Sequence, residues 1–166
     1  MSHPDVPPTD AAYAQRLVAR MAAGDAEALQ LLYDTHGARI LRFLHALTGD
    51  QHLAEDLTQE TFLAAWGAAA RYRPRAPVEH WLFTIARRLG WRQTSRHRRS
   101  LEQLRALPGA RETPDSSAPD ERLGLHDEVR RLHEALVGLE PRLRLVFVLV
   151  RIAGCTYAET ARIARL

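Results

Sequence analysis

One stretch, residues 71–99, restricts the fold more than any other part of the chain. Its sequence is RYRPRAPVEHWLFTIARRLGWRQTSRHRR, which sets many arginines against a single acid, Glu79. Its apolar residues recur at helical spacing, so one face should pack inward; they are Trp81, Leu82, Ile85, Ala86 and Leu89. The stretch therefore predicts an amphipathic helix whose opposite face is a basic stripe, formed by Arg87, Arg88, Arg92 and Arg96.

The basic stripe indicates contact with a nucleic acid. Arginine binds phosphate bidentately and stacks on bases. The chain has no lysine, so all 23 of its Lys and Arg residues are arginine. Tyr72 and Trp91 are interleaved with the arginines and could stack on bases, whereas Trp81 belongs to the apolar face and is expected in the core. A solvated charged face is the alternative, but solubility does not require such one-sided charge.

Length and composition fit an ordinary globular protein. The 166 residues are 46% hydrophobic, which suits one domain or two small ones. Cys155 is the sole cysteine, so no intrachain disulfide can form, as in proteins of a reducing cytoplasm. The N-terminus lacks a signal-peptide pattern, and no apolar run reaches the length of a membrane span. We therefore expect a cytoplasmic protein without a membrane span.

The periodicity along the chain predicts an all-α fold. After a disordered tail at residues 1–8, four helices should form one domain over residues 9–100. Thr9, Asp25 and the turn at Thr48–Asp50 supply caps for the first three. The helices are expected at about residues 9–23, 26–47, 51–70 and 78–99. The third should have an acidic outward face, made of Glu55, Asp56, Gln59 and Glu60.

The composition changes after this domain. Residues 101–124 are rich in proline, glycine and serine, which predicts a linker whose first part, up to Leu107, can be helical. Residues 125–166 then predict a second small helical domain. Pro141 begins a helix there, and Thr156 and Glu159 form a capping box at the start of the last one. The expected inward face of the Pro141 helix consists of Leu143, Val146, Phe147 and Val150.

Three motifs resemble those of bacterial RNA polymerase sigma factors of the extracytoplasmic-function type. They are GDQHLAEDLTQETFLAAW at residues 49–66, WLFTIARRLGW at residues 81–91, and LEPRLRLVFVLVRIAGCTYAETARIA at residues 139–164. Together they cover most of the chain in the family's order. The resemblance implies a four-helix sigma region 2 domain, a flexible linker and a C-terminal helix-turn-helix (region 4) domain.

The resemblance also implies a function without catalysis and without a cofactor. Such a factor directs core RNA polymerase to promoters and stabilises the melted −10 element during transcription initiation. Its implied partners are the β and β′ subunits of the polymerase, promoter DNA and an anti-sigma factor. The implied polymerase-binding residues are Glu55, Asp56, Gln59, Glu60 and Phe62.

The family's −10 contacts match the loop before the fourth helix and the helix itself. The residues implied here are Arg71, Tyr72, Arg73, Arg75, Arg87, Arg88, Trp91, Arg92, Arg96, Arg98 and Arg99. Two of them depart from the family, which usually has Asn at the position of Arg88 and Asp at that of Arg92. The added charges predict a stronger non-specific affinity for DNA and leave the preferred −10 base open.

The helix-turn-helix departs from the family by omission. The chain ends at Leu166, before the helix that would enter the major groove at the −35 element. We expect trimming rather than a naturally short domain, because three helices leave Ile152 and Ile163 without a full partner surface. The residues Thr156, Tyr157 and Arg162 could still contact DNA backbone on the −35 side.

Other functions remain open from the residues alone. A metal site could involve His36, His45 and His52 with Glu55 or Asp56, although no paired Glu-x-x-His set is present. A catalytic thiol at Cys155 has no evident activating base. An operator-binding helix-turn-helix regulator not associated with polymerase would leave the acidic helix and the basic stripe without a role. An interaction module held by an inhibitor is compatible with the sigma-factor interpretation.

Overall fold

The computed structural model describes residues 11–105, 131, 134–136 and 138–164, with the side chains of residues 97–105 excepted. Every regular element in these ranges is helical, as predicted. Several predicted parts lie outside the described residues: the tail at residues 1–8, the Thr9 cap, residues 106–124 of the linker and most of residues 125–139 of the second predicted domain. In the described part of the chain, no helix is both long enough and apolar enough to cross a bilayer.

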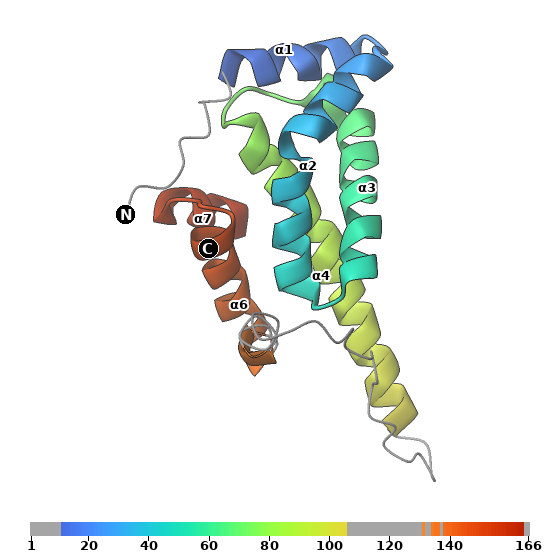
Figure 1. Ribbon diagram of the computed structural model, residues 1–166, viewed down its shortest axis with the longest axis vertical. Coiled ribbons are helices and arrows are strands. Elements are labelled where there is room, and N and C mark those ends of the chain that lie inside the picture. Colours follow the sequence, from blue (N-terminus) through green and yellow to red (C-terminus); the bar gives the residue numbers. More distant parts are fainter. Residues whose placement is uncertain (1–10, 106–130, 132–133, 137, 165–166) are drawn as a thin grey trace, which may run out of the picture.

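Four helices form the N-terminal bundle. They are α1 (Ala11–Ala22), α2 (Ala26–Thr48), α3 (Gln51–Ala68) and α4 (Val78–Arg105). Figure 1 shows α2, α3 and α4 side by side, with α1 lying across one end of them. A short 3-10 turn, η1 (Ala69–Arg71), ends α3 and leads into the loop before α4. The helix α4 continues to Arg105, into the stretch that composition had assigned to the linker.

The helix starts follow from caps that the sequence contains. The Asp25 carboxylate accepts hydrogen bonds from the backbone N–H of Glu27 (3.0 Å) and Ala28 (3.4 Å), after Gly24 has stopped α1 with φ +90°. Asp50 accepts from the Leu53 N–H at 3.0 Å. Each such cap contributes about 1 kcal/mol, and both confirm the predicted starts of α2 and α3.

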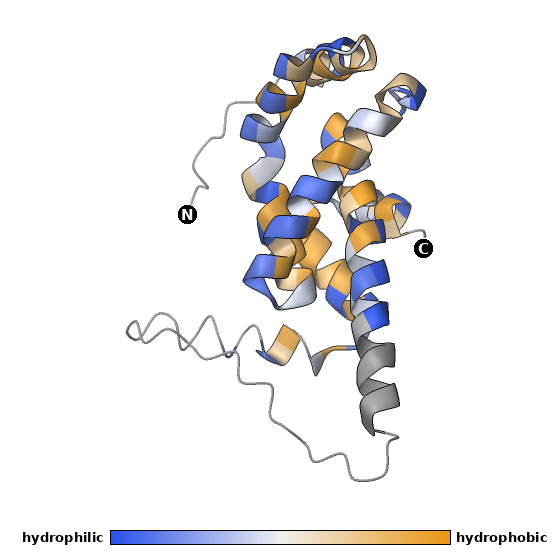
Figure 2. Cartoon of the chain, turned by 90° about the vertical axis from the view of Figure 1, so that its right-hand side faces the viewer, coloured by the Kyte–Doolittle hydropathy of each residue, from blue (hydrophilic) through white to orange (hydrophobic). Residues whose placement is uncertain are grey.

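The core of the bundle lies between the facing sides of these helices. Phe43 of α2 and Phe83 of α4 pack edge to face with ring centroids 5.2 Å apart, and both are fully buried. Figure 2 shows hydrophobic residues gathered on the inner sides of the helices and hydrophilic ones on the outer sides. The apolar periodicity of α4 is confirmed, since Leu82, Ile85 and Ala86 are all buried.

The C-terminal segment packs along the bundle. It consists of α6 (Pro141–Phe147), a π-helical turn η2 (Val148–Ile152) and α7 (Tyr157–Ala164), and it lies beside α2 and α4 in Figure 1. The predicted inward face of α6 is wrong. Leu143 and Phe147 are exposed, and the buried residues are Leu145, Val148 and Leu149. The region is apolar on several sides, so docking onto the bundle, rather than periodicity, selects the buried side.

This docking gives the two predicted domains one continuous core. Leu149 and Ile163 are at most 1% exposed and belong to the same buried cluster as the bundle residues. The expectation that Ile163 would lack a partner surface is therefore wrong, because α4 and its neighbours supply that surface. Two arginines add polar links: Arg39 donates to the Ala153 carbonyl at 2.5 Å, and Arg144 donates to the Leu47 carbonyl at 3.2 Å.

Candidate nucleic-acid and partner-binding surfaces

The outward side of α3 is an acidic surface. Its inward side includes several small residues, two of which, Thr58 and Thr61, are polar. These two can be buried because their hydroxyls donate hydrogen bonds to the carbonyls of Ala54 and Leu57, each at 2.7 Å. The opposite side is solvent-exposed and carries the four predicted polar residues, Glu55, Asp56, Gln59 and Glu60. We call these four residues the acidic face.

Phe62 does not share this exposure. It is 2% exposed, and its ring centroid lies 4.9 Å from that of Tyr33 on α2. Phe62 therefore shapes the surface from beneath, and direct contact with a partner, as the resemblance implied, is not available in this conformation. Leu63, which sequence analysis missed, is 64% exposed on the same helix. Its signal in the sequence is an apolar residue that falls off the inward stripe.

The loop between η1 and α4 carries exposed arginine side chains, and a side-chain hydrogen bond within the loop supports its backbone. Arg71, Arg73 and Arg75 are exposed. The Tyr72 hydroxyl donates to the Ala76 carbonyl at 2.9 Å, and the Tyr72 ring lies 4.9 Å from the Trp81 ring. Tyr72 is thus engaged with Trp81 rather than held open for a base. Trp81 itself is half-buried against the core, close to its predicted place.

The basic side of α4 continues from this loop. Arg88, Arg92 and Arg96 are exposed and four residues apart, so they follow one another along a single helix face. Arg87 and Trp91 are half-buried. Arg98 and Arg99 lie on α4, but their side chains are outside the described part of the chain. Of the four arginines of the predicted basic stripe, Arg88, Arg92 and Arg96 are therefore the exposed ones, and from here on the basic stripe means these three residues.

The acidic face and the basic stripe occupy different helices, and both are open to solvent. They are not buried against each other, which would have made both unavailable. The Arg71–Arg75 loop, however, faces α7 across a hollow of about 270 Å³. Residues from the loop, from α4 and from α7 line it: Arg71, Tyr72, Arg73, Arg75, Ala76, His80, Trp81, Thr84, Glu159, Arg162 and Ile163.

The predicted capping box of α7 is confirmed. The Thr156 N–H donates to the Glu159 carboxylate at 2.7 Å, and the Glu159 N–H donates to the Thr156 hydroxyl at 3.3 Å. These bonds, the Thr156 backbone bond first, lower the pKa of Glu159. Thr156 is therefore occupied by capping, while Tyr157 is 79% exposed and Arg162 is exposed at the edge of the hollow.

A partly buried polar group joins α2 to α4. Glu79 forms an ion pair with Arg39, and the His36 ring nitrogen lies 4.0 Å from the same carboxylate. Burial, with a smaller effect of the Arg39 charge, lowers the pKa of His36 to about 4. Burial raises the pKa of Glu79, and the Arg39 charge opposes that rise. His36 is therefore a neutral, structural histidine at pH 7.

The metal site suggested by the sequence does not form in the described structure. His36 is buried in the α2–α4 contact, whereas His52 is exposed on α3 with a nitrogen 4.0 Å from Glu55. Burial, with a smaller effect of Glu159, raises the pKa of Cys155 to about 11, so the thiol is protonated and a poor nucleophile at neutral pH. A different set of potential metal ligands does lie close together in the described structure, namely His80, Cys155 and Glu159.

Comparisons with known proteins give the relatives of this chain. Residues 32–100 match the family model for sigma-70 region 2. The RNA polymerase sigma factor CarQ of Myxococcus xanthus is 33% identical over 142 residues, which are 84% of this chain and 78% of CarQ. The ECF RNA polymerase sigma factor SigL of Mycobacterium tuberculosis is 39% identical over 113 residues, or 63% of this chain. This alignment spans 58% of the length of SigL.

A solved structure is similar over nearly the whole chain. It is CnrH in complex with the cytosolic domain of CnrY, with a TM-score of 0.67 and 25% sequence identity. The similarity covers 93% of this chain and 84% of CnrH. It therefore extends beyond the four-helix bundle into the rest of the chain.

Proposed function

Because the chain belongs to the extracytoplasmic-function family of RNA polymerase sigma factors, we propose that it directs core RNA polymerase to promoters and stabilises the melted −10 element. The observation that carries this proposal is the pair of separate, exposed and oppositely charged surfaces on one bundle. In this proposal residues 9–100 act as region 2 and residues 125–166 as region 4. The chain works in the cytoplasm, as a binding factor and not as an enzyme.

The acidic face is the proposed polymerase contact. Compact negative charge complements a basic surface on the β′ subunit, steers the encounter and fixes the docking register more than it adds affinity. Leu63 lies on the same helix and would add apolar contact area, which charge alone does not provide. Phe62 contributes by holding α3 against Tyr33.

The basic stripe and the loop before it are the proposed DNA contact. Unstacking a base costs a few kcal/mol, which stacking and phosphate contacts must offset. In this proposal the exposed Arg88, Arg92 and Arg96 contact the DNA backbone along α4. The exposed arginines of the loop would hold the strand there; they are Arg71, Arg73 and Arg75. The proposed base contacts lie near the hollow and Trp91.

An inhibitory protein is a further proposed partner. The similar solved structure contains CnrH with the cytosolic domain of CnrY. Since the likeness covers 93% of this chain and so extends beyond the four-helix bundle, an anti-sigma factor of comparable kind could bind the same fold here. The operator-binding alternative would use Tyr157 and Arg162 alone and would leave both charged surfaces of the bundle without a role.

Run-off transcription tests the proposal. Purified core polymerase is incubated with a promoter library, with and without this protein. We expect transcripts from a subset of promoters that share a −10 sequence, and only when the protein is added. Promoter-specific DNA binding that neither needs core polymerase nor produces transcripts would contradict the proposal and support the operator-binding regulator.

A further inference from the structure

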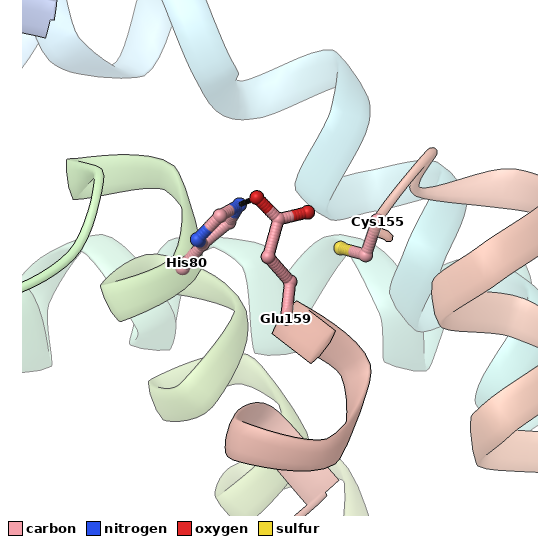
Figure 3. A group of neighbouring side chains, drawn as sticks. All are labelled: His80, Cys155 and Glu159. Carbon is pink, nitrogen blue, oxygen red and sulfur yellow. Dashed lines mark ion pairs between the residues drawn. The ribbon is translucent and has the colours of Figure 1, made fainter. Parts of the chain in front are cut away.

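Three metal-ligating side chains meet where the C-terminal segment docks on the bundle. His80 comes from the first turn of α4, Cys155 from the turn before α7, and Glu159 from the first turn of α7. Figure 3 shows the Glu159 carboxylate between the imidazole and the sulfur. One ligand atom of each residue lies within 4.8 Å of the other two, and the His80 Nε2 to Glu159 Oε1 distance is 3.3 Å.

This donor set and spacing suit zinc. Zinc accepts imidazole nitrogen, thiolate sulfur and carboxylate oxygen in tetrahedral geometry, with bonds that place neighbouring ligand atoms about 3.3–3.6 Å apart. The His80–Glu159 pair already has that spacing, and the remaining pairs must shorten by at most about 1.5 Å. His80 and Glu159 also line the hollow, which offers an entry path for the ion and space for a fourth ligand from solvent.

The surrounding contacts orient two of the three ligands. One Glu159 oxygen, Oε2, accepts from the Thr156 N–H at 2.7 Å, which leaves Oε1 directed at His80. The Cys155 N–H donates to the Leu149 carbonyl at 2.9 Å and fixes the turn that carries the thiol. Such outer bonds are what hold metal ligands in position. On metal binding the thiol would release its proton to solvent.

We propose that His80, Cys155 and Glu159 bind one zinc-class divalent cation, which clasps α7 to α4. Because the ligands come from both sides of the docking contact, the ion would stabilise the docked arrangement of the C-terminal segment. The proposal concerns binding and does not depend on the role in transcription. The alternative is a His80–Glu159 ion pair beside a buried thiol that binds no metal.

Zinc titration of the full chain, stripped with a chelator, tests the proposal by competition with a fluorescent zinc indicator. We expect one zinc per chain, with affinity lowered about 100-fold or more in Cys155→Ser and in His80→Gln. His52→Gln is the matched control, since His52 is an exposed histidine on α3, and it should bind as the unchanged protein does. No binding, or equal binding by all four proteins, would overturn the proposal.

A measurement on the unchanged chain guards against variants that fail to fold. Bound Co²⁺ should give a thiolate-to-cobalt charge-transfer absorption, because Cys155 is the chain's one thiol. Zinc should also raise the Tm of the unchanged chain, since a ligand of the folded state stabilises it. Bound cobalt without the thiolate absorption, or an unchanged Tm at saturating zinc, would refute the clasp.

Discussion

The residue that most clearly shows how burial sets chemistry is His36. Its pKa of about 4 lies below the ordinary value of 6.5, so the unfolded chain binds a proton here at pH values where the folded chain does not. The stability that the folded chain has while His36 is neutral is therefore fully present above about pH 6.5, and it is lost as pH falls toward 4. The difference between the folded and unfolded pKa values of His36 corresponds to roughly 3 kcal/mol of unfolding free energy.

A leucine at this position should remove that pH dependence. We expect His36→Leu to flatten the fall in unfolding free energy between pH 6.5 and 4.5, measured by urea denaturation monitored by circular dichroism. His52→Leu serves as the control, because His52 is fully exposed and should leave the fall unchanged. The comparison between variants isolates the effect of His36, because Glu79 is present in both variants. The raised pKa of Glu79 acts in the opposite direction, at pH values above its ordinary value of 4.5. An equally steep fall in His36→Leu would contradict this account.

Gly90 lies at a close approach of α2 and α4. A Cβ there would lie 3.0 Å from a Leu47 methyl and 3.3 Å from a Leu44 methyl. We expect Gly90→Leu to lower the free energy of unfolding by about 1–3 kcal/mol through overpacking. Gly67→Leu on α3 is the matched control, because nothing lies within 4 Å of its Cβ position; it should be neutral or stabilising. Equal effects of both substitutions in thermal unfolding would argue against the close contact.

At the scale of elements, the acidic face carries a charge-reversal prediction. Asp56→Arg combined with Glu60→Arg should abolish co-purification with core polymerase while the helical circular dichroism stays unchanged. Asp34→Arg, an exposed acid on α2, is the control and should bind as before. Polymerase binding that survives the double reversal would show that the contact lies elsewhere.

The basic stripe predicts a salt effect. Replacing Arg92 and Arg96 with alanine should reduce the salt slope of promoter-complex stability by about 1 for each arginine that binds a phosphate. Arg42→Ala, another exposed arginine on α2, should leave the slope unchanged. Dissociation rates of open complexes at several salt concentrations give the slope. If it does not move, these arginines do not bind phosphate.

Local signals in the sequence predicted the elements well, and long-range packing limited the rest. Asp25, Asp50 and the Thr156–Glu159 capping box each identify a helix start because their hydrogen bonds close within three residues. The burial of Phe62 could not be predicted from local signals, since it depends on packing against Tyr33 from another helix. The grouping of His80 with Cys155 and Glu159 depends on a docking contact between segments far apart in the sequence.

At the scale of the whole molecule, the docked C-terminal segment faces the loop proposed to hold DNA. Glu159 and Arg162 line the same hollow as Arg71–Arg75, so a strand entering there would compete with α7. Cys155 reports on this docking, because it is the chain's one cysteine and is 5% exposed. We therefore expect the segment to leave the bundle when the initiation complex forms.

Thiol labelling in the presence of a chelator checks that expectation. Cys155 should react slowly with a thiol reagent in the isolated protein and faster once core polymerase and promoter DNA are added. The protein with core polymerase and a DNA lacking a promoter is the control. A rate that stays equally slow in the initiation complex would show that the segment remains docked.

The account's central claim is that one bundle holds the polymerase with its acidic face and a melted strand with its basic stripe. Permanganate footprinting of unpaired thymines at the −10 element tests both contacts on one promoter. With core polymerase, the unchanged protein should make these thymines reactive. The Asp56→Arg, Glu60→Arg variant should give no reactivity and no polymerase binding, whereas the Arg92→Ala, Arg96→Ala variant should bind polymerase but leave the thymines weakly reactive. Full reactivity with either variant would contradict the claim.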